Sequence, residues 1–171
     1  MTTKTEENSR FVGTLIDGAR MYAAAADAVN DKLPNSLHVL SHLLGMSAEL
    51  TLKSYLKHNN LPTSELRKLG HDLAALYKRA QDFGLLHTDS RNFRLSVLGA
   101  NYQERIFAYP EEAQLNVIQP GSLRETLQDL ILEVFEVVKG QKVLEALIEQ
   151  PGLAIQSVYP ENIDASSWAV R

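Results

Sequence analysis

The stretch SLHVLSHLLGMSAELTLKSYLKHN, residues 36–59, decides the fold of this chain. When its residues are projected at about 100° each, the apolar side chains point to nearly all sides of a helix. A helix that is apolar on most of its sides is usually surrounded by other elements of the domain. We therefore predict that residues 36–59 form a central helix.

A narrow line of polar side chains runs along this apolar helix, within an arc of about 60°. It consists of His38, His42, Glu49 and Lys53. In one interpretation, these residues are hydrogen-bonded to neighbouring helices, and Glu49 pairs with Lys53 across one helical turn. In a second, they line a ligand pocket between helices. In a third, His38 and His42 are two metal ligands, spaced correctly on one helix face.

Helical periodicity continues on both sides of this stretch, and no segment shows the alternating pattern of a strand. It predicts further helices over residues 8–31, 71–83, 89–107 and 122–149. We expect Asp89 or Ser90 to cap the helix over residues 89–107. Ser122 and Glu125 match a capping box at the start of the last helix.

These helices predict an all-α protein with an antiparallel four- to five-helix up-and-down bundle, because short loops favour antiparallel neighbours. The bundle covers residues 1–150. An irregular tail follows over residues 151–171, and its Trp168 indicates that it docks on its own or a partner subunit.

The composition narrows the classes of function. The 171 residues contain no cysteine, which excludes disulfides, thiol catalysis and thiolate metal sites. The formal net charge of −4 argues against indiscriminate binding of nucleic acid. The N-terminal residues MTTKTEENSR lack the apolar stretch of a secretory signal, and no apolar run is long enough to span a membrane. We therefore expect a cytoplasmic protein without a membrane partner.

The stretch ELRKLGHDLAALYKRAQDFGL, residues 65–85, gathers charged and polar side chains at the start of a helix. In the structural interpretation, Gly70 breaks the preceding turn and His71 or Asp72 caps the new helix. In a second interpretation, a ligand binds there, because Arg67 and Lys68 flank a helix N-terminus that attracts anions. Catalysis is the third, since histidine suits proton transfer near neutral pH and arginine stabilises phosphate charge.

Residues 41–85 together resemble the HEPN domain family. Its members read as an apolar helix with an internal Glu-x-x-x-Lys, then a loop, then a Gly/Thr-His-Asp-Leu helix start with a leucine three residues on. The matching positions here are Glu49, Lys53, His71, Asp72, Leu73 and Leu76. The stretch NYQERIFAYP, residues 101–110, looks like the Arg-Tyr-Pro-type segment of some members, through Arg105 and Tyr109.

This resemblance implies an antiparallel helical bundle that forms a homodimer. Many members of the family are metal-independent RNases, often in toxin–antitoxin or phage-defence systems, and others are non-catalytic binding or regulatory modules. The RNases carry an arginine followed by a histidine with four to six residues between them. Arg67 and His71 have three residues between them, and Arg91 has no histidine at the required positions.

Our leading hypothesis is a non-catalytic, HEPN-like binding or regulatory module without a cofactor. It would bind a protein partner or a nucleotide or RNA ligand, through His42, Glu49, Lys53, Lys68, Asp72 and Tyr109. The alternative is a divergent metal-independent RNase that uses Arg67 and His71, with Arg105 as a further candidate. A third hypothesis is a metal-dependent helical-bundle enzyme that uses His38, His42 and Glu49.

Overall fold

The computed structural model describes residues 4–33, 36–103 and 120–143. These residues are helical and contain no strand, which confirms the all-α class. The helices with bounds in this part are α1 (Lys4–Lys32), α2 (Leu37–His58), α3 (Thr63–Leu69), α4 (Leu73–Asp82), α5 (Asp89–Gln103) and α6 (Pro120–Lys139), and residues 141–143 are also helical.

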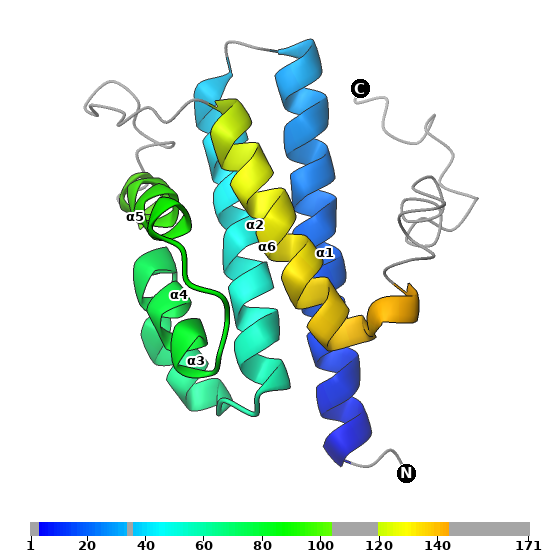
Figure 1. The fold of residues 1–171 in the computed structure, drawn as a ribbon. Helices are drawn as coiled ribbons and strands as arrows, with labels where there is room; N and C mark the ends of the chain where they lie inside the picture. The colour runs from blue at the N-terminus through cyan, green and yellow to red at the C-terminus, as the bar shows by residue number, and fades with distance from the viewer. Residues whose placement is uncertain (1–3, 34–35, 104–119, 144–171) are drawn as a thin grey trace, which may run out of the picture.

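Helix α2 lies at the centre of the described part (Figure 1). The long helices α1 and α6 pack on one side of it, and the shorter α3, α4 and α5 pack on the other. α2 contacts all five of these helices, so the prediction of a central helix is confirmed. Its apolar residues fill a core shared with both groups, whose fully buried members include Ile16, Leu52, Leu56, Leu73, Leu76, Tyr77, Leu130 and Val134.

Two buried serines of α2 show that α1 and α2 are antiparallel. The Ser47 hydroxyl donates to the carbonyl oxygen of Ala19 at 2.9 Å, and the Ser54 hydroxyl donates to that of Val12 at 3.0 Å. The partners therefore run backwards along α1 as the chain advances along α2. Both hydroxyls are satisfied, as buried polar groups require.

Two ion pairs show that α6 is also antiparallel to α1. Lys139 lies 2.9 Å from Asp17, and Arg124 lies 2.6 Å from Asp27. Helices α2 and α6 are therefore parallel neighbours, and strict up-and-down alternation does not hold for this pair. Hydrophobic patterns predict which face of a helix is buried, but they do not predict its direction, so the sequence could not distinguish the two arrangements.

The start of α4 follows the structural interpretation of its sequence. Gly70 adopts φ +57°, ψ −122°, in the region that favours glycine. The Asp72 carboxylate then accepts a hydrogen bond from the backbone N–H of Ala75 at 2.9 Å, so Asp72 is the N-cap. Helix α3 just before it was not predicted, because seven residues are too few to show a helical period.

Two other predicted helix starts are wrong in detail. The Thr88 hydroxyl accepts from the backbone N–H of Arg91 at 3.1 Å, so Thr88 caps α5 in place of Asp89 or Ser90. α6 begins at Pro120, which suits a first helical position, and Ser122 therefore lies inside the helix and does not cap it.

α6 ends at Lys139, ten residues before the end that the sequence predicts for the last helix at residue 149. Gly140, with φ +91°, follows the last residue of α6, Lys139. The predicted domain end at residue 150 and the docked tail over residues 151–171 lie outside the described residues.

Candidate functional site

Glu49 is the centre of a polar cluster inside the fold. Only 5% of this residue is exposed, and its carboxylate accepts three hydrogen bonds. Lys53 Nζ donates to Oε1 at 2.5 Å, while His71 Nδ1 and the Tyr102 hydroxyl each lie 2.9 Å from Oε2. We call these four residues the Glu49 cluster; it joins α2, the turn before α4, and α5.

Gly45 allows Tyr102 to reach Glu49. A Cβ atom at Gly45 would lie 2.6 Å from Cδ2 and 2.9 Å from Cγ of the Tyr102 ring. Such distances are well below the ordinary contact of about 3.5–4.0 Å between carbon atoms. The absence of a side chain at Gly45 therefore lets the ring lie directly against the backbone of α2, one turn before Glu49.

The backbone position of His71 is set by its two neighbours, each of which has a fixed conformation. Gly70 ends the turn that follows α3, and Asp72 caps α4. The Tyr102 ring packs beside the imidazole, with ring centroids 6.1 Å apart and planes at 76°. This edge-to-face geometry is one that aromatic rings favour.

The hydrogen bonds outweigh burial in setting the charge of Glu49. Burial alone would raise the pKa of Glu49, but the hydrogen bonds from Lys53, His71 and Tyr102, together with the charge of Lys53, hold it below its ordinary value. Burial, and then the neighbouring Glu49 carboxylate, raise the pKa of Tyr102. At neutral pH, the cluster therefore contains an ionised carboxylate and a protonated phenol.

His71 brings this buried cluster to the surface. Its side chain is 71% exposed, whereas that of Lys53 is 19% exposed. Nδ1 is used by Glu49, and Nε2 has no partner among the residues that the structure describes. The exposed His42 also lies near Tyr102, with ring centroids 5.7 Å apart. The arrangement can hold an imidazole in one orientation at the surface.

The predicted line of polar residues on α2 divides into a buried and an exposed part. Glu49 and Lys53 form the predicted pair across one turn, and Glu49 is buried between helices. His42 is exposed, so the interpretation that the line forms a pocket between helices does not hold for this residue. The helical projection predicts the direction of a side chain around the axis of α2, but it does not predict how far along that axis the neighbouring helices extend.

The structure does not bring Arg67 and Lys68 into the cluster. Both are exposed in the last turn of α3, and neither forms a hydrogen bond or ion pair with another described residue. Asp72 uses its carboxylate as the helix cap, so it places negative charge where an anion was expected to bind. Arg105 and Tyr109 lie outside the described residues.

The metal hypothesis finds little support in the described part of the chain. Nδ1 of His38 is buried and has no hydrogen-bond partner there. Nowhere in residues 4–33, 36–103 and 120–143 do three His, Asp or Glu side chains lie close enough together to hold a metal ion. His38 and His42 therefore lack a third ligand within these ranges.

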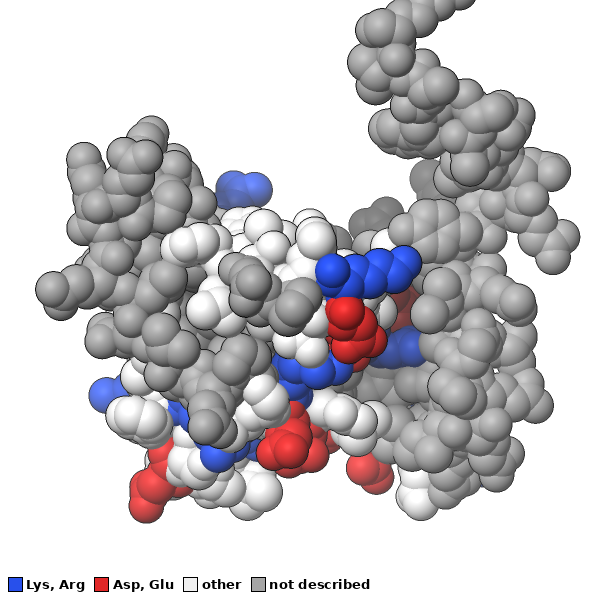
Figure 2. All heavy atoms as spheres, turned by 90° about the horizontal axis from the view of Figure 1, so that it is seen from above, with Lys and Arg blue, Asp and Glu red and all other residues white. Residues whose placement is uncertain are grey.

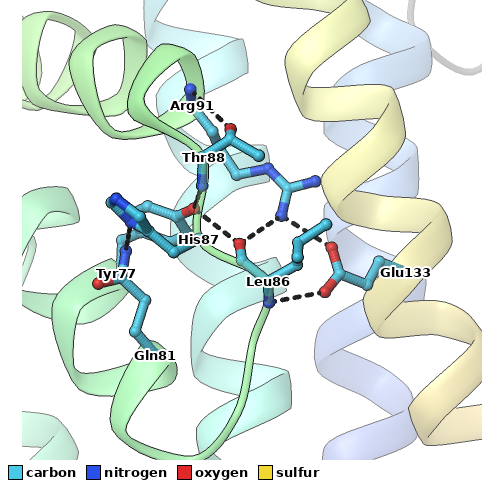
Figure 3. A network of polar contacts seen from close by, with 7 residues as sticks. All are labelled: Tyr77, Gln81, Leu86, His87, Thr88, Arg91 and Glu133. Carbon is cyan, nitrogen blue, oxygen red and sulfur yellow. Dashed lines mark hydrogen bonds and ion pairs between the residues drawn. The ribbon is translucent and has the colours of Figure 1, made fainter.

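A second polar network, around Arg91, was not predicted (Figure 3). Arg91 is 7% exposed, and its Nη1 donates to Glu133 of α6 at 2.7 Å and to the carbonyl oxygen of Leu86 at 3.1 Å. The other carboxylate oxygen of Glu133 accepts from the backbone N–H of Leu86 at 3.0 Å. The Tyr77 hydroxyl also donates to the Leu86 carbonyl, at 2.9 Å. This network joins the turn between α4 and α5 to α6, so Arg91 has a structural role.

The charges on the surface do not form a patch of one sign at the end of the bundle seen in Figure 2. Basic and acidic side chains lie next to one another over the described part of that face. Arg124 of α6 and Asp27 of α1 form an ion pair between helices. This mixture agrees with the argument from net charge against indiscriminate binding of nucleic acid.

Comparison with known proteins found no match. No family model, no curated protein and no solved structure matches this chain. Within the described ranges, no helix is long and apolar enough to cross a membrane.

Proposed function

We propose that this chain is a non-catalytic, HEPN-like binding or regulatory module whose ligand, a nucleotide or RNA, binds at the surface of the Glu49 cluster. One observation carries the proposal: the exposed imidazole of His71 is held by the buried carboxylate of Glu49. A side chain that is already fixed loses less conformational entropy when it binds a ligand.

The positions that carry the family resemblance support the proposal. Glu49 and Lys53 form the Glu-x-x-x-Lys pair, and His71 opens the second motif. Lys53 and His71 both contact the Glu49 carboxylate directly, although His71 is 22 residues from Glu49. Leu73 and Leu76 of the same motif are fully buried, so they fix the helix that follows His71.

Two basic residues near His71, Arg67 and Lys68, oppose the single negative charge of Asp72 and can attract a phosphate group. Lys53 is neutralised by Glu49, so the cluster carries no excess negative charge. Lys68 is three residues before His71, so its Cα lies within about 11 Å of that of His71. The Lys68 ammonium has no hydrogen-bond or ion-pair partner within the described ranges. Arg67 adds a second unpaired charge nearby. Two such charges attract a phosphate over about one Debye length at physiological salt.

Binding measurements test this proposal. AMP, ATP and a short single-stranded RNA would be titrated into the full chain and into His71→Ala. Loss of one neutral hydrogen bond costs about 0.5–1.5 kcal/mol, so we expect about two- to twelvefold weaker binding by the variant. His58→Ala is the matched control, because His58 is an exposed histidine at the C-terminal end of α2, nine residues after Glu49. Equal weakening by both variants, or no binding of any probe, would contradict the proposal.

A divergent metal-independent RNase is the second candidate, because a histidine held by a carboxylate is also the arrangement of a general base. In that case, Arg67 would stabilise the phosphate charge beside His71. RNA incubated with the pure protein in EDTA distinguishes the two functions. The binding module leaves the RNA intact, whereas the RNase cuts it and loses this activity in His71→Ala.

The family resemblance also supports a homodimer and a toxin–antitoxin or phage-defence setting for this module. Sedimentation of the full chain tests the homodimer directly. Co-purification of a protein partner encoded beside this chain tests the setting.

A further inference from the structure

We infer that Glu49 is a positioning residue that holds the neutral imidazole of His71 in the tautomer with its hydrogen on Nδ1. The lone pair of Nε2 is then the hydrogen-bond acceptor that the surface offers to a ligand. The ligand part of this inference rests on the proposed function, whereas the tautomer does not. In free histidine no neighbour selects the tautomer, so this state is a property of the fold.

The assignment follows from the protons available around Glu49. An ionised carboxylate has no hydrogen to donate, so each of its partners must be the donor. Lys53 and Tyr102 fill two of the three hydrogen bonds from their own protons. The third runs to His71 Nδ1 at 2.9 Å, and only a hydrogen on Nδ1 can form it.

Tyr102 has two acceptors within reach of its single hydroxyl proton. Its oxygen lies 2.9 Å from Glu49 Oε2 and 2.7 Å from the sulfur of Met46. The carboxylate is a much stronger acceptor than a thioether, so the proton goes to Glu49. Oε2 has two lone pairs, and it therefore accepts from Tyr102 and from His71 at the same time.

The hydrogen bond to Glu49 disfavours the flipped orientation of the imidazole. A flip about the ring axis would replace Nδ1 by a carbon atom and leave an oxygen of the buried Glu49 with one hydrogen bond fewer. Tyr102 packs edge-on against the imidazole, and Tyr102 is itself held against Gly45. The ring of His71 therefore has one favoured orientation, with Nε2 away from Glu49.

This tautomer limits the chemistry of the ligand. While the imidazole is neutral, Nε2 can only accept, so the bound ligand must present an O–H or N–H group to it. The ammonium of Lys53, which is partly exposed, can only donate. A ligand that pairs a donor with an anionic oxygen satisfies both residues, and a ligand without a donor does not.

His87 provides an internal contrast in the same chain. Its Nε2 lies 3.2 Å from the carboxylate of Asp89, and its Nδ1 lies 2.9 Å from the amide nitrogen of Gln81. The carboxylate requires a hydrogen on Nε2, and the amide donates to the lone pair of Nδ1. His87 should therefore have the opposite tautomer to His71.

Nitrogen NMR tests the inference on the full chain without a ligand. Two-bond ¹H–¹⁵N correlations, recorded at a pH where the imidazoles are neutral, show which ring nitrogen carries the hydrogen. We expect the protonated nitrogen to be Nδ1 in His71 and Nε2 in His87. A His71 spectrum dominated by the form with hydrogen on Nε2 overturns the inference, and the wild-type spectrum alone decides this.

Two variants identify Glu49 as the cause. Glu49→Gln replaces the carboxylate by a weaker, neutral acceptor, so the Nδ1–H population of His71 should fall. Glu65→Gln is the control, because Glu65 is a glutamate of α3 that contacts Arg79 and not His71. An unchanged tautomer in Glu49→Gln removes the positioning role. If the tautomer is confirmed but no nucleotide or RNA binds, the proposed function fails and the inference about His71 stands.

Discussion

Replacing Gly45 by alanine tests the close packing of Tyr102 on α2. The new methyl group would lie 2.6, 2.9 and 3.0 Å from three ring carbons of Tyr102. Overpacking of this kind costs about 1–3 kcal/mol. Displacing the ring also lengthens the hydrogen bond from Tyr102 to Glu49, which as a bond to a charged group contributes about 1.5–3 kcal/mol.

One effect opposes this cost. Alanine is favoured over glycine inside a helix by about 1 kcal/mol. The net destabilisation expected for Gly45→Ala is therefore about 3 kcal/mol. For a chain of this length, that corresponds to a fall of about 6–12 °C in the melting temperature.

Urea unfolding and thermal melting would measure this change. Gly121→Ala is the matched control, because a Cβ atom at Gly121 has nothing within 4 Å and Gly121 also lies in a helix. The control should be as stable as the original chain or slightly more stable. A Gly45→Ala protein that behaves like this control would refute the reasoning.

A double mutant identifies the partner. If the Tyr102 ring causes the cost, then Gly45→Ala should be neutral or stabilising in a Tyr102→Ala background, because only the helix propensity remains. A full cost in that background would show that Gly45 is required for another reason.

Three further predictions concern other contacts of the fold. The pKa of Glu49 is lowered in the folded chain, so the contribution of Glu49 to stability is complete above the unfolded pKa of about 4.3 and is lost as the pH falls below it. In urea unfolding, Glu49→Gln should therefore lose less free energy of unfolding between neutral and acid pH than the original chain does. An equal loss in the two proteins would contradict this. Arg91→Met should cost about 2 kcal/mol in the same assay, because the Glu133 carboxylate loses its ion-pair partner and the Leu86 carbonyl keeps only its bond from Tyr77, whereas Arg67→Met at the surface should change stability by less than about 0.5 kcal/mol. Asp72→Ala should cost about 1 kcal/mol and Asp72→Asn much less, since asparagine is an equally good cap; equal losses would exclude the capping role.

Local features of the fold could be predicted from the sequence. The position of α2 follows from its apolar surface, and the pair of Glu49 and Lys53 follows from helix geometry, because residues four apart share a face. The cap at Asp72 follows from the preference of aspartate for this position. In each case, the decisive contacts lie within one element or at its end.

Contacts between distant residues could not be predicted in this way. Tyr102 is 53 residues from Glu49, and Arg91 is 42 residues from Glu133. No periodic pattern relates residues at such distances, since both contacts depend on how helices pack. The contact between Tyr102 and Gly45 depends on the same packing, although Gly45 is an isolated glycine inside a helical pattern, which is a recognisable signal of close approach.

The position of α6 has a consequence for synthesis on the ribosome. Helices α1 and α2 form a local hairpin that can fold as soon as both have emerged, whereas α6 contacts both of them and is made last among the described helices. Until then, the apolar surfaces that α6 covers on the hairpin remain open to water. A nascent chain with exposed apolar surface is prone to aggregation and is a substrate for chaperones. Translation pauses before residue 120 would therefore lower the yield of folded protein more than pauses after residue 139.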